Sequence, residues 1–207
     1  MKKICLLSAA LLLASCAPSM DRVAAEAMSA YQNKNYAVAV QDFRKAAEMG
    51  DAQSQLMLGK CYDFGQGVEK NPTQAAHWYR LAAEQGNDNA QDNLGTCYAE
   101  GAGVPLNMQL AYVWYSRAAQ QGNASAYNNL GLCYRNGEGV EQNAEQAAAC
   151  FRSAAERSNT DGMYNLGRCY FHGLGVPQDE AQARRWVGRA AALGHSNAKA
   201  FMQDNNW

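Results

Sequence analysis

The sequence has little charge, few histidines and almost no long apolar stretch. Lysine, arginine, aspartate and glutamate make up 18% of its 207 residues, the formal net charge is −1, and like charges do not gather in a run. A nucleic-acid-binding protein would carry a basic stripe, so nucleic acid is not an expected partner. The three histidines, His77, His172 and His195, do not make a metal cluster, and no metal or cofactor is expected.

The apolar stretch at the N-terminus is far shorter than the roughly 20 residues that a bilayer-spanning helix needs, which indicates a secretory signal. Residues 13–16, Leu-Ala-Ser-Cys, resemble a bacterial lipobox. The resemblance implies a signal peptide over 1–15, acylation of Cys16 and an acylated linker over 16–20. Ala17 stands where an aspartate would retain such a lipoprotein at the inner membrane, so an outer-membrane anchor facing the periplasm is expected. The alternative is an ordinary signal peptide that contains a cysteine.

A glycine-rich motif occurs four times. The copies are LGKCYDFGQGV from Leu58, LGTCYAEGAGV from Leu94, LGLCYRNGEGV from Leu130 and LGRCYFHGLGV from Leu166, each 36 residues after the last. A phosphate-binding or catalytic loop is needed once, whereas a structural turn is needed once per unit. Regular spacing in this range predicts a solenoid, in which each unit buries its apolar face against its neighbours.

Each unit is predicted to form two helices. In the second unit Ala90, Leu94 and Tyr98 are spaced four apart, a stripe along one side of a helix. The Gly-x-Gly segment should end that helix, because glycine tolerates left-handed backbone. An N-cap residue should then begin the second helix, which carries one packing face and a pair of alanines. The predicted caps are Asn71, Asn107, Asn143 and Asp179.

The combined pattern, A-x-x-x-L-G-x-x-Y-x-x-G-x-G-V followed by N or D and then A-x-x-W-Y-x-x-A-A-x-x-G, resembles the Sel-one-like repeat family, relatives of the tetratricopeptide repeat. It departs from that pattern at Cys150-Phe151, at Val187 and at Ser158. The resemblance implies an all-α fold, a right-handed α-solenoid of antiparallel helix pairs whose concave wall is lined by the first helix of each pair. The four units are 51–86, 87–122, 123–158 and 159–194.

The two ends should cap the solenoid. Residues 21–50 lack the glycine loop, and Asn33-Lys34-Asn35 predicts a tight turn, so this segment resembles a tetratricopeptide helix pair. Residues 195–207 begin another first helix and stop. We interpret them as a C-terminal capping helix whose Trp207 covers the last repeat.

Five cysteines remain after processing besides Cys16. Cys61, Cys97, Cys133 and Cys169 recur at one repeat position, and stacked helices place equivalent atoms roughly 10 Å apart, beyond the reach of a disulfide. They are expected to be free, buried and small apolar side chains. Cys150 stands where other units have tryptophan, and a bridge to Cys133 or Cys169 remains open.

Two patterns could indicate catalysis. Ser196-Asn197-Ala198-Lys199 reads S-x-x-K, and a cysteine-rich branch of the resembled family has been linked to β-lactam binding and hydrolysis. No S-D-N or K-T-G accompanies it, however. Cys169 and His172 could share a helix face, but two ligands do not close a zinc site. No catalytic residues are therefore predicted, and the protein is not expected to be an enzyme.

The remaining candidates are the variable positions of the first helices, which should face the concave groove. In tetratricopeptide proteins that grip extended peptides, asparagine and basic residues at such places hold the peptide. The alternative is that the asparagines are a habit of the family, each bonded within its own helix. The sequence predicts a scaffold of the cell envelope that binds a protein or peptide, or alternatively an accessory to cell-wall enzymes or a β-lactam-binding protein. The candidate groove residues are Lys60, Asp63, Asn93, Thr96, Glu100, Asn129, Arg135, Asn136, Asn165, Arg168 and His172.

Overall fold

The structure is a computed structural model that describes residues 19–207. The signal peptide and Cys16, both predicted from the sequence, lie outside the described residues. From Ser19 to Trp207 the elements are all helices. They are α2 (Met20–Gln32), α3 (Tyr36–Glu48), α4 (Ala52–Phe64), α5 (Pro72–Glu84), α6 (Asp88–Glu100), α7 (Met108–Gln120), α8 (Ala124–Asn136), α9 (Ala144–Glu156), α10 (Thr160–His172), α11 (Glu180–Ala192) and α12 (Ser196–Asp204).

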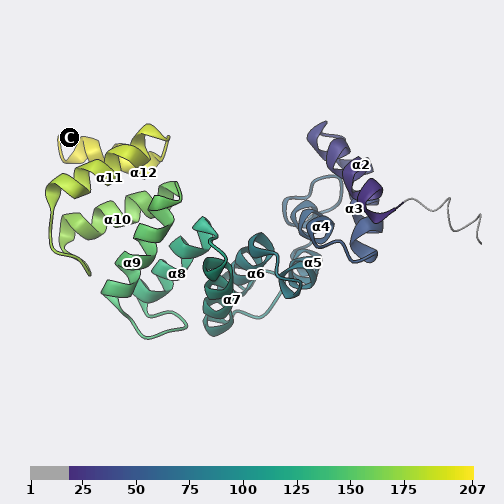
Figure 1. The fold of residues 1–207 in the computed structure, drawn as a ribbon, viewed down its shortest axis with the longest axis horizontal. Coiled ribbons are helices and arrows are strands. Elements are labelled where there is room, and N and C mark those ends of the chain that lie inside the picture. Colours follow the sequence, from purple (N-terminus) through teal and green to yellow (C-terminus); the bar gives the residue numbers. More distant parts are fainter. Residues whose placement is uncertain (1–18) are drawn as a thin grey trace, which may run out of the picture.

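The helices pack in pairs, and the pairs follow one another in a single curved row. In Figure 1 the row runs from α2 and α3, in purple, to α11 and α12, in yellow. Each helix contacts mainly its partner and the next helix along the chain. This is the predicted α-solenoid of helix pairs, so the fold class is confirmed. No helix within residues 19–207 has the length and apolarity that crossing a bilayer would require.

Side-chain caps set where the helices begin. The carboxylate of Asp51 accepts a hydrogen bond from the Ser54 amide at 2.7 Å, and Asn71 accepts one from the Gln74 amide at 3.1 Å. Such a cap satisfies an amide that has no partner within the helix. The predicted caps of all four second helices are confirmed: Asn71, Asn107, Asn143 and Asp179 each accept a backbone N–H three residues on.

A close approach between the two helices of a repeat explains the glycine after each repeated leucine. A Cβ on Gly131 would lie 2.6 Å from a ring carbon of Phe151, and one on Gly95 would lie 2.7 Å from the ring of Tyr115. The second helix therefore packs its ring directly on the backbone of the first. The paired alanines of the second helices are likewise buried, which permits neighbouring helices to approach closely.

The C-terminal helix α12 covers the last repeat. The ring centroid of Trp207 lies 5.6 Å from that of Phe171 in α10 and 5.7 Å from that of Phe201. The predicted contact of Trp207 with the fourth repeat is therefore confirmed.

Ser158 occupies a position at which the other repeats have glycine. Its φ is +65°, and the corresponding glycines, Gly86, Gly122 and Gly194, also have positive φ. A side chain costs roughly 1–2 kcal/mol in left-handed backbone, partly offset by the entropy that glycine adds to the unfolded chain. Ser158→Gly should therefore raise the free energy of unfolding by about 1 kcal/mol, measured by denaturant titration. Ser153→Gly, inside α9, should lower it, and equal effects of the two changes would contradict this explanation.

Candidate partner-binding groove

The first helices carry both the uniform positions and the variable ones. Leucine, glycine and cysteine recur in every copy and are buried; examples are Leu94, Gly95 and Cys97 in α6. Positions two or three residues beyond each of these cysteines differ in every copy, with Asp63, Ala99, Arg135 and Phe171 at one and Phe64, Glu100, Asn136 and His172 at the next. The uniform residues build the core, and the variable ones are left to define the surface.

Three of the predicted groove residues come together near the N-terminal end. Lys60, Asp63 and Asn93 line a depression of about 490 Å³ with Phe64, whose surface is 68% exposed. Asp63 accepts a hydrogen bond from the hydroxyl of Tyr79 at 3.3 Å. The depression thus offers a cation, a carboxylate, an amide and an apolar ring within one surface.

The prediction that Asn129 and Asn165 stand exposed in the groove is wrong. Both are half-buried, and their side-chain amides join neighbouring first helices. Asn129 Nδ2 donates to Asp92 Oδ1 and Asn165 Nδ2 donates to Asn128 Oδ1, each at 2.9 Å. The alternative, that these asparagines bond within their own helix, is also wrong, because each acceptor belongs to the first helix of the preceding repeat. Asn93 lacks the same bond because Leu56 stands where an acceptor would be needed.

Thr96 also serves the interior rather than the groove. Its hydroxyl donates to the carbonyl of Asp92 at 3.2 Å and accepts from the hydroxyl of Tyr115 at 3.2 Å. The expectation that Thr96 is available to a ligand is therefore wrong. Glu100, at the end of the same helix, is exposed.

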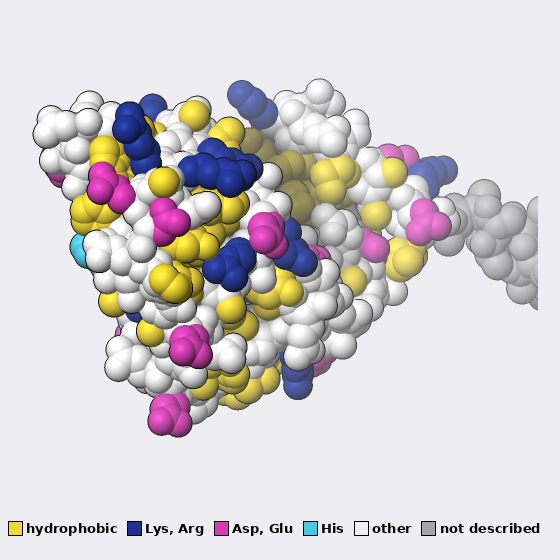
Figure 2. All heavy atoms as spheres, turned by 60° about the vertical axis from the view of Figure 1, so that its left-hand side comes forward, with side chains coloured by type: hydrophobic (Ala, Val, Ile, Leu, Met, Phe, Trp, Pro, Cys, Tyr) yellow, Lys and Arg dark blue, Asp and Glu magenta, His cyan; other side chains and the backbone are white. Residues whose placement is uncertain are grey.

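The C-terminal half of the groove is basic. Arg135 donates to Asn136 Oδ1 at 3.2 Å and to Asn165 Oδ1 at 3.4 Å. Arg168 lies with Asn165 and Arg135 around one recess. In Figure 2, which brings this end of the molecule forward, basic side chains lie among apolar surface. His172 is exposed beside the ring of Phe171.

The five cysteines of the described chain are buried and unbridged. Burial raises the pKa of the Cys61, Cys97, Cys133 and Cys150 thiols to about 11, because desolvation disfavours a thiolate. The thiolate is the reactive form, so these side chains are inert at neutral pH. They serve as packing residues, and Cys150 does so beside Cys133 in one apolar cluster.

The residues of the two catalytic patterns are not assembled into a site. Ser196 and Lys199 are both exposed on α12, which is the surface placement expected from the sequence. Cys169 is buried and His172 exposed, so the two side chains do not converge. Between residues 19 and 207, no three metal-ligating side chains lie close enough to hold an ion.

A set of polar side chains that the repeat pattern did not predict joins one repeat to the next. Arg80 donates to the hydroxyl of Tyr98 and Arg152 to that of Tyr170, each at 3.2 Å. Gln91 donates to the carbonyl of Ala83 at 3.1 Å and accepts from Gln121 at 2.8 Å. The recurrent spacing of 18 residues between the arginines and tyrosines was the available signal.

A row of interlocked helix pairs, uniform inside and variable along the first helices, defines the protein as a helical-repeat scaffold. The sequence model of the Sel1 repeat matches residues 22–51, 52–87, 88–123, 124–159 and 160–195. The chain therefore belongs to the Sel1 repeat family. The first match covers the segment that we interpreted as a tetratricopeptide-like cap. Sel1 repeat proteins are in general scaffolds that bind protein partners rather than enzymes.

Solved structures of the same family are similar to this chain. A protective antigen of uropathogenic Escherichia coli is 38% identical over 86% of this chain and 39% of its own, with a TM-score of 0.79. A Sel1 repeat protein of Oxalobacter formigenes is 33% identical over 87% of this chain and 73% of its own, with a TM-score of 0.83. The chain thus spans about two fifths of the first relative. The search of curated proteins gave no match.

Proposed function

We propose that the protein is a lipid-anchored scaffold of the bacterial cell envelope that holds a partner protein against the variable face of its first helices. The observation that carries the proposal is the surface around Lys60, Asp63 and Phe64. An exposed aromatic ring beside opposite charges, at positions that the packing does not constrain, is typical of a site for protein contact. The envelope location rests on the lipobox resemblance at residues 13–16.

Site-directed photocrosslinking in intact cells tests the partner surface. A photoreactive amino acid at position 64 should give a discrete adduct with one envelope protein, because Phe64 would lie inside the interface. The same group at Glu84, exposed at the end of the second helix α5, is the matched control. Asp63→Lys should weaken the adduct by reversing a charge in the surface. Equal adducts from positions 64 and 84 would contradict the proposed surface.

The anchor is tested by replacing the two cysteines of the N-terminal segment separately. Cys16→Ser should release the protein from membranes after a high-salt wash, because the acyl chains would be missing. Cys5→Ser should leave it in the membrane fraction, because that residue precedes the predicted cleavage site. Retention of the Cys16→Ser protein in the membrane fraction would disprove lipid anchoring while leaving the crosslinking result unaffected.

A further inference from the structure

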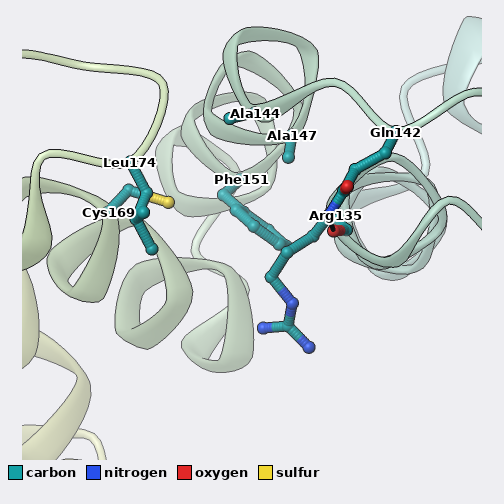
Figure 3. Close-up of a pocket in the computed structure, with 7 residues that line it drawn as sticks. All are labelled: Arg135, Gln142, Ala144, Ala147, Phe151, Cys169 and Leu174. Carbon is teal, nitrogen blue, oxygen red and sulfur yellow. Dashed lines mark hydrogen bonds between the residues drawn. The ribbon is translucent and has the colours of Figure 1, made fainter.

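A cavity of about 450 Å³ lies between the third and fourth repeats. Its walls are Phe151, Ala144 and Ala147 of α9, Cys169 and Leu174 on the side of α10, and Arg135 at the end of α8. Figure 3 shows Phe151 projecting from α9 between the side chains of Leu174 and Arg135. An adjoining recess of about 190 Å³ adds Asn165 and Arg168. This volume falls in the range of small-molecule sites.

The same place one repeat earlier is nearly filled. Its lining residues stand 36 positions before residues of the cavity and its adjoining recess, and the space is about 100 Å³. Met108 stands there in place of Ala144, and Tyr115 in place of Phe151. A longer side chain and an extra hydroxyl, which is bonded to Thr96 at 3.2 Å, occupy space that is open between the third and fourth repeats. The space is therefore larger at this junction than at the preceding one because of these side-chain differences.

The charged residues also differ between these two junctions. Arg135 and Arg168 replace Ala99 and Leu132, and Leu174 replaces Glu138. Within residues 19–207 neither arginine forms an ion pair. Burial raises the pKa of the Cys169 thiol, and the two guanidinium groups act in the opposite direction. The cavity mouth is therefore positive, and an anion would meet uncompensated charge there.

The uncharged polar side chains at the cavity are already engaged. The amide of Asn165 donates to Asn128 at 2.9 Å and accepts from Arg135 at 3.4 Å. Gln142 Nε2 donates to the backbone carbonyl of Arg135 at 2.8 Å. A bound peptide would need partners for the N–H and C=O groups along its whole backbone, and only these two amides, each already bonded within the protein, are present. The charged donors are the N–H groups of the two guanidiniums, which suit a carboxylate.

We propose that this cavity binds a small amphiphilic carboxylate of the fatty-acid type. Its carboxylate lies between Arg135 and Arg168, and its hydrocarbon chain lies against Phe151, Ala144 and Leu174. This site goes beyond the scaffold role and does not depend on it, because the surface around Phe64 is a different part of the solenoid. The ligand is selected by one charged end and an aliphatic body, and it needs no hydrogen bonds along its length.

The test is calorimetric titration of the full-length protein in detergent with decanoate, compared with decanol and acetate. Decanoate should bind at one site, decanol at least tenfold more weakly because it lacks the charge, and acetate not measurably. The double variant Arg135→Gln, Arg168→Gln should weaken decanoate at least tenfold. Detergent contributes the same heat of titration for every variant, so differences in decanoate affinity between variants are due to the cavity.

A second variant tests the shape of the cavity independently of its charge. Ala144→Met introduces the residue that the preceding repeat carries at Met108, so the fold and the melting temperature should be unchanged while decanoate binding falls at least tenfold. Ala149→Met, exposed on the same helix, should bind as the wild type does. The proposal is overturned if wild type does not bind decanoate, or if Ala144→Met binds it equally well. It is also overturned if a peptide with a C-terminal phenylalanine carboxylate displaces decanoate at lower concentration, which would assign the cavity to a protein chain.

Discussion

Gly139→Ala is expected to lower the free energy of unfolding by about 3 kcal/mol or more. The φ of Gly139 is +74°, and a Cβ there would lie 2.1 Å from the carbonyl oxygen of Met108 at the start of α7. Left-handed backbone costs a side chain roughly 1–2 kcal/mol. The overlap adds a further cost of about 1–3 kcal/mol, because a backbone carbonyl at a helix terminus cannot move aside as a flexible side chain can.

The loss should fall on the junction between the second and third repeats. Met108 belongs to the second repeat and Gly139 to the third, so the substitution pushes two stacked units apart. Stability in a solenoid is approximately a sum over repeats and their interfaces. We therefore expect denaturant unfolding, followed by circular dichroism, to show a lower midpoint and a broader transition in which the two halves unfold separately.

Gly137→Ala is the matched control. Gly137 belongs to the same loop and its φ is +75°, but a Cβ there would meet nothing closer than the Cβ of Gln142, at 3.3 Å. The backbone strain is the same and the carbonyl overlap is absent, so this variant should lose roughly 1–2 kcal/mol. If both variants lose the same amount, the close approach of loop and helix is not what requires glycine at position 139.

Asp92→Asn is expected to stabilise the protein at neutral pH. Burial raises the pKa of the Asp92 carboxyl to about 6, although the hydrogen bond from Asn129 acts in the opposite direction and Asp88 adds to the rise. The ionised carboxylate therefore costs the folded state about 2–3 kcal/mol above pH 6, at 1.36 kcal/mol for each unit. Asparagine keeps the acceptor oxygen for Asn129 and removes the charge.

The repeat itself supplies the precedent for this substitution. Position 128 is the equivalent of position 92, it is asparagine, and it accepts the amide of Asn165 at the same 2.9 Å. The variant would give the junction between the second and third repeats the side-chain pair that already joins the third to the fourth. The local packing should therefore be retained.

The pH dependence distinguishes this explanation from a general gain in packing. The folded wild type holds the Asp92 proton more tightly than the unfolded chain does, so between about pH 4 and pH 6 its stability falls as pH rises. The advantage of Asp92→Asn should be largest above pH 6 and disappear near pH 4, measured as free energies of unfolding across this range. Glu84→Gln, at an exposed carboxyl, should show no such trend. A gain of Asp92→Asn that is independent of pH would contradict the assigned cause.

The repeating part of the fold could be predicted from particular residues because its causes are local. Asn71 predicts the start of α5 through an oxygen three residues from the amide that it caps, and Gly65 predicts the end of α4 through backbone that glycine tolerates. Both causes act within a few residues of the chain. The leucine, glycine and cysteine of each copy identify the buried face for the same reason, since a helix repeats its surface every 3.6 residues.

The groove was predicted less well because its chemistry depends on the stacking of separate helices. The sequence places Asn129 and Asn165 at the recurrent position of Asn93, with nothing to separate their roles. The structure brings residue 129 opposite residue 92, and residue 165 opposite residue 128. Two of the three amides therefore donate to an acceptor within the protein instead of to a ligand. The position 37 residues before Asn93 is Leu56, which has no acceptor in its side chain. That offset of 37 residues follows from how adjacent repeats stack, not from the pattern within one repeat.

The sequence by itself determined the helix boundaries, the number of 36-residue units, the buried face and the family, because capping, left-handed glycine and helical periodicity are short-range effects. Only the tertiary structure decided which polar side chains remain available and where space is left. The cavity beside Phe151 exists because Ala144 and Phe151 of α9 and Leu174 of the loop after α10 replace larger or polar residues at one junction. Arg135 and Arg168 meet at its mouth although 33 residues separate them. Volume and electrostatic potential are sums over residues that are distant in the chain, and their value is set only when the helices pack.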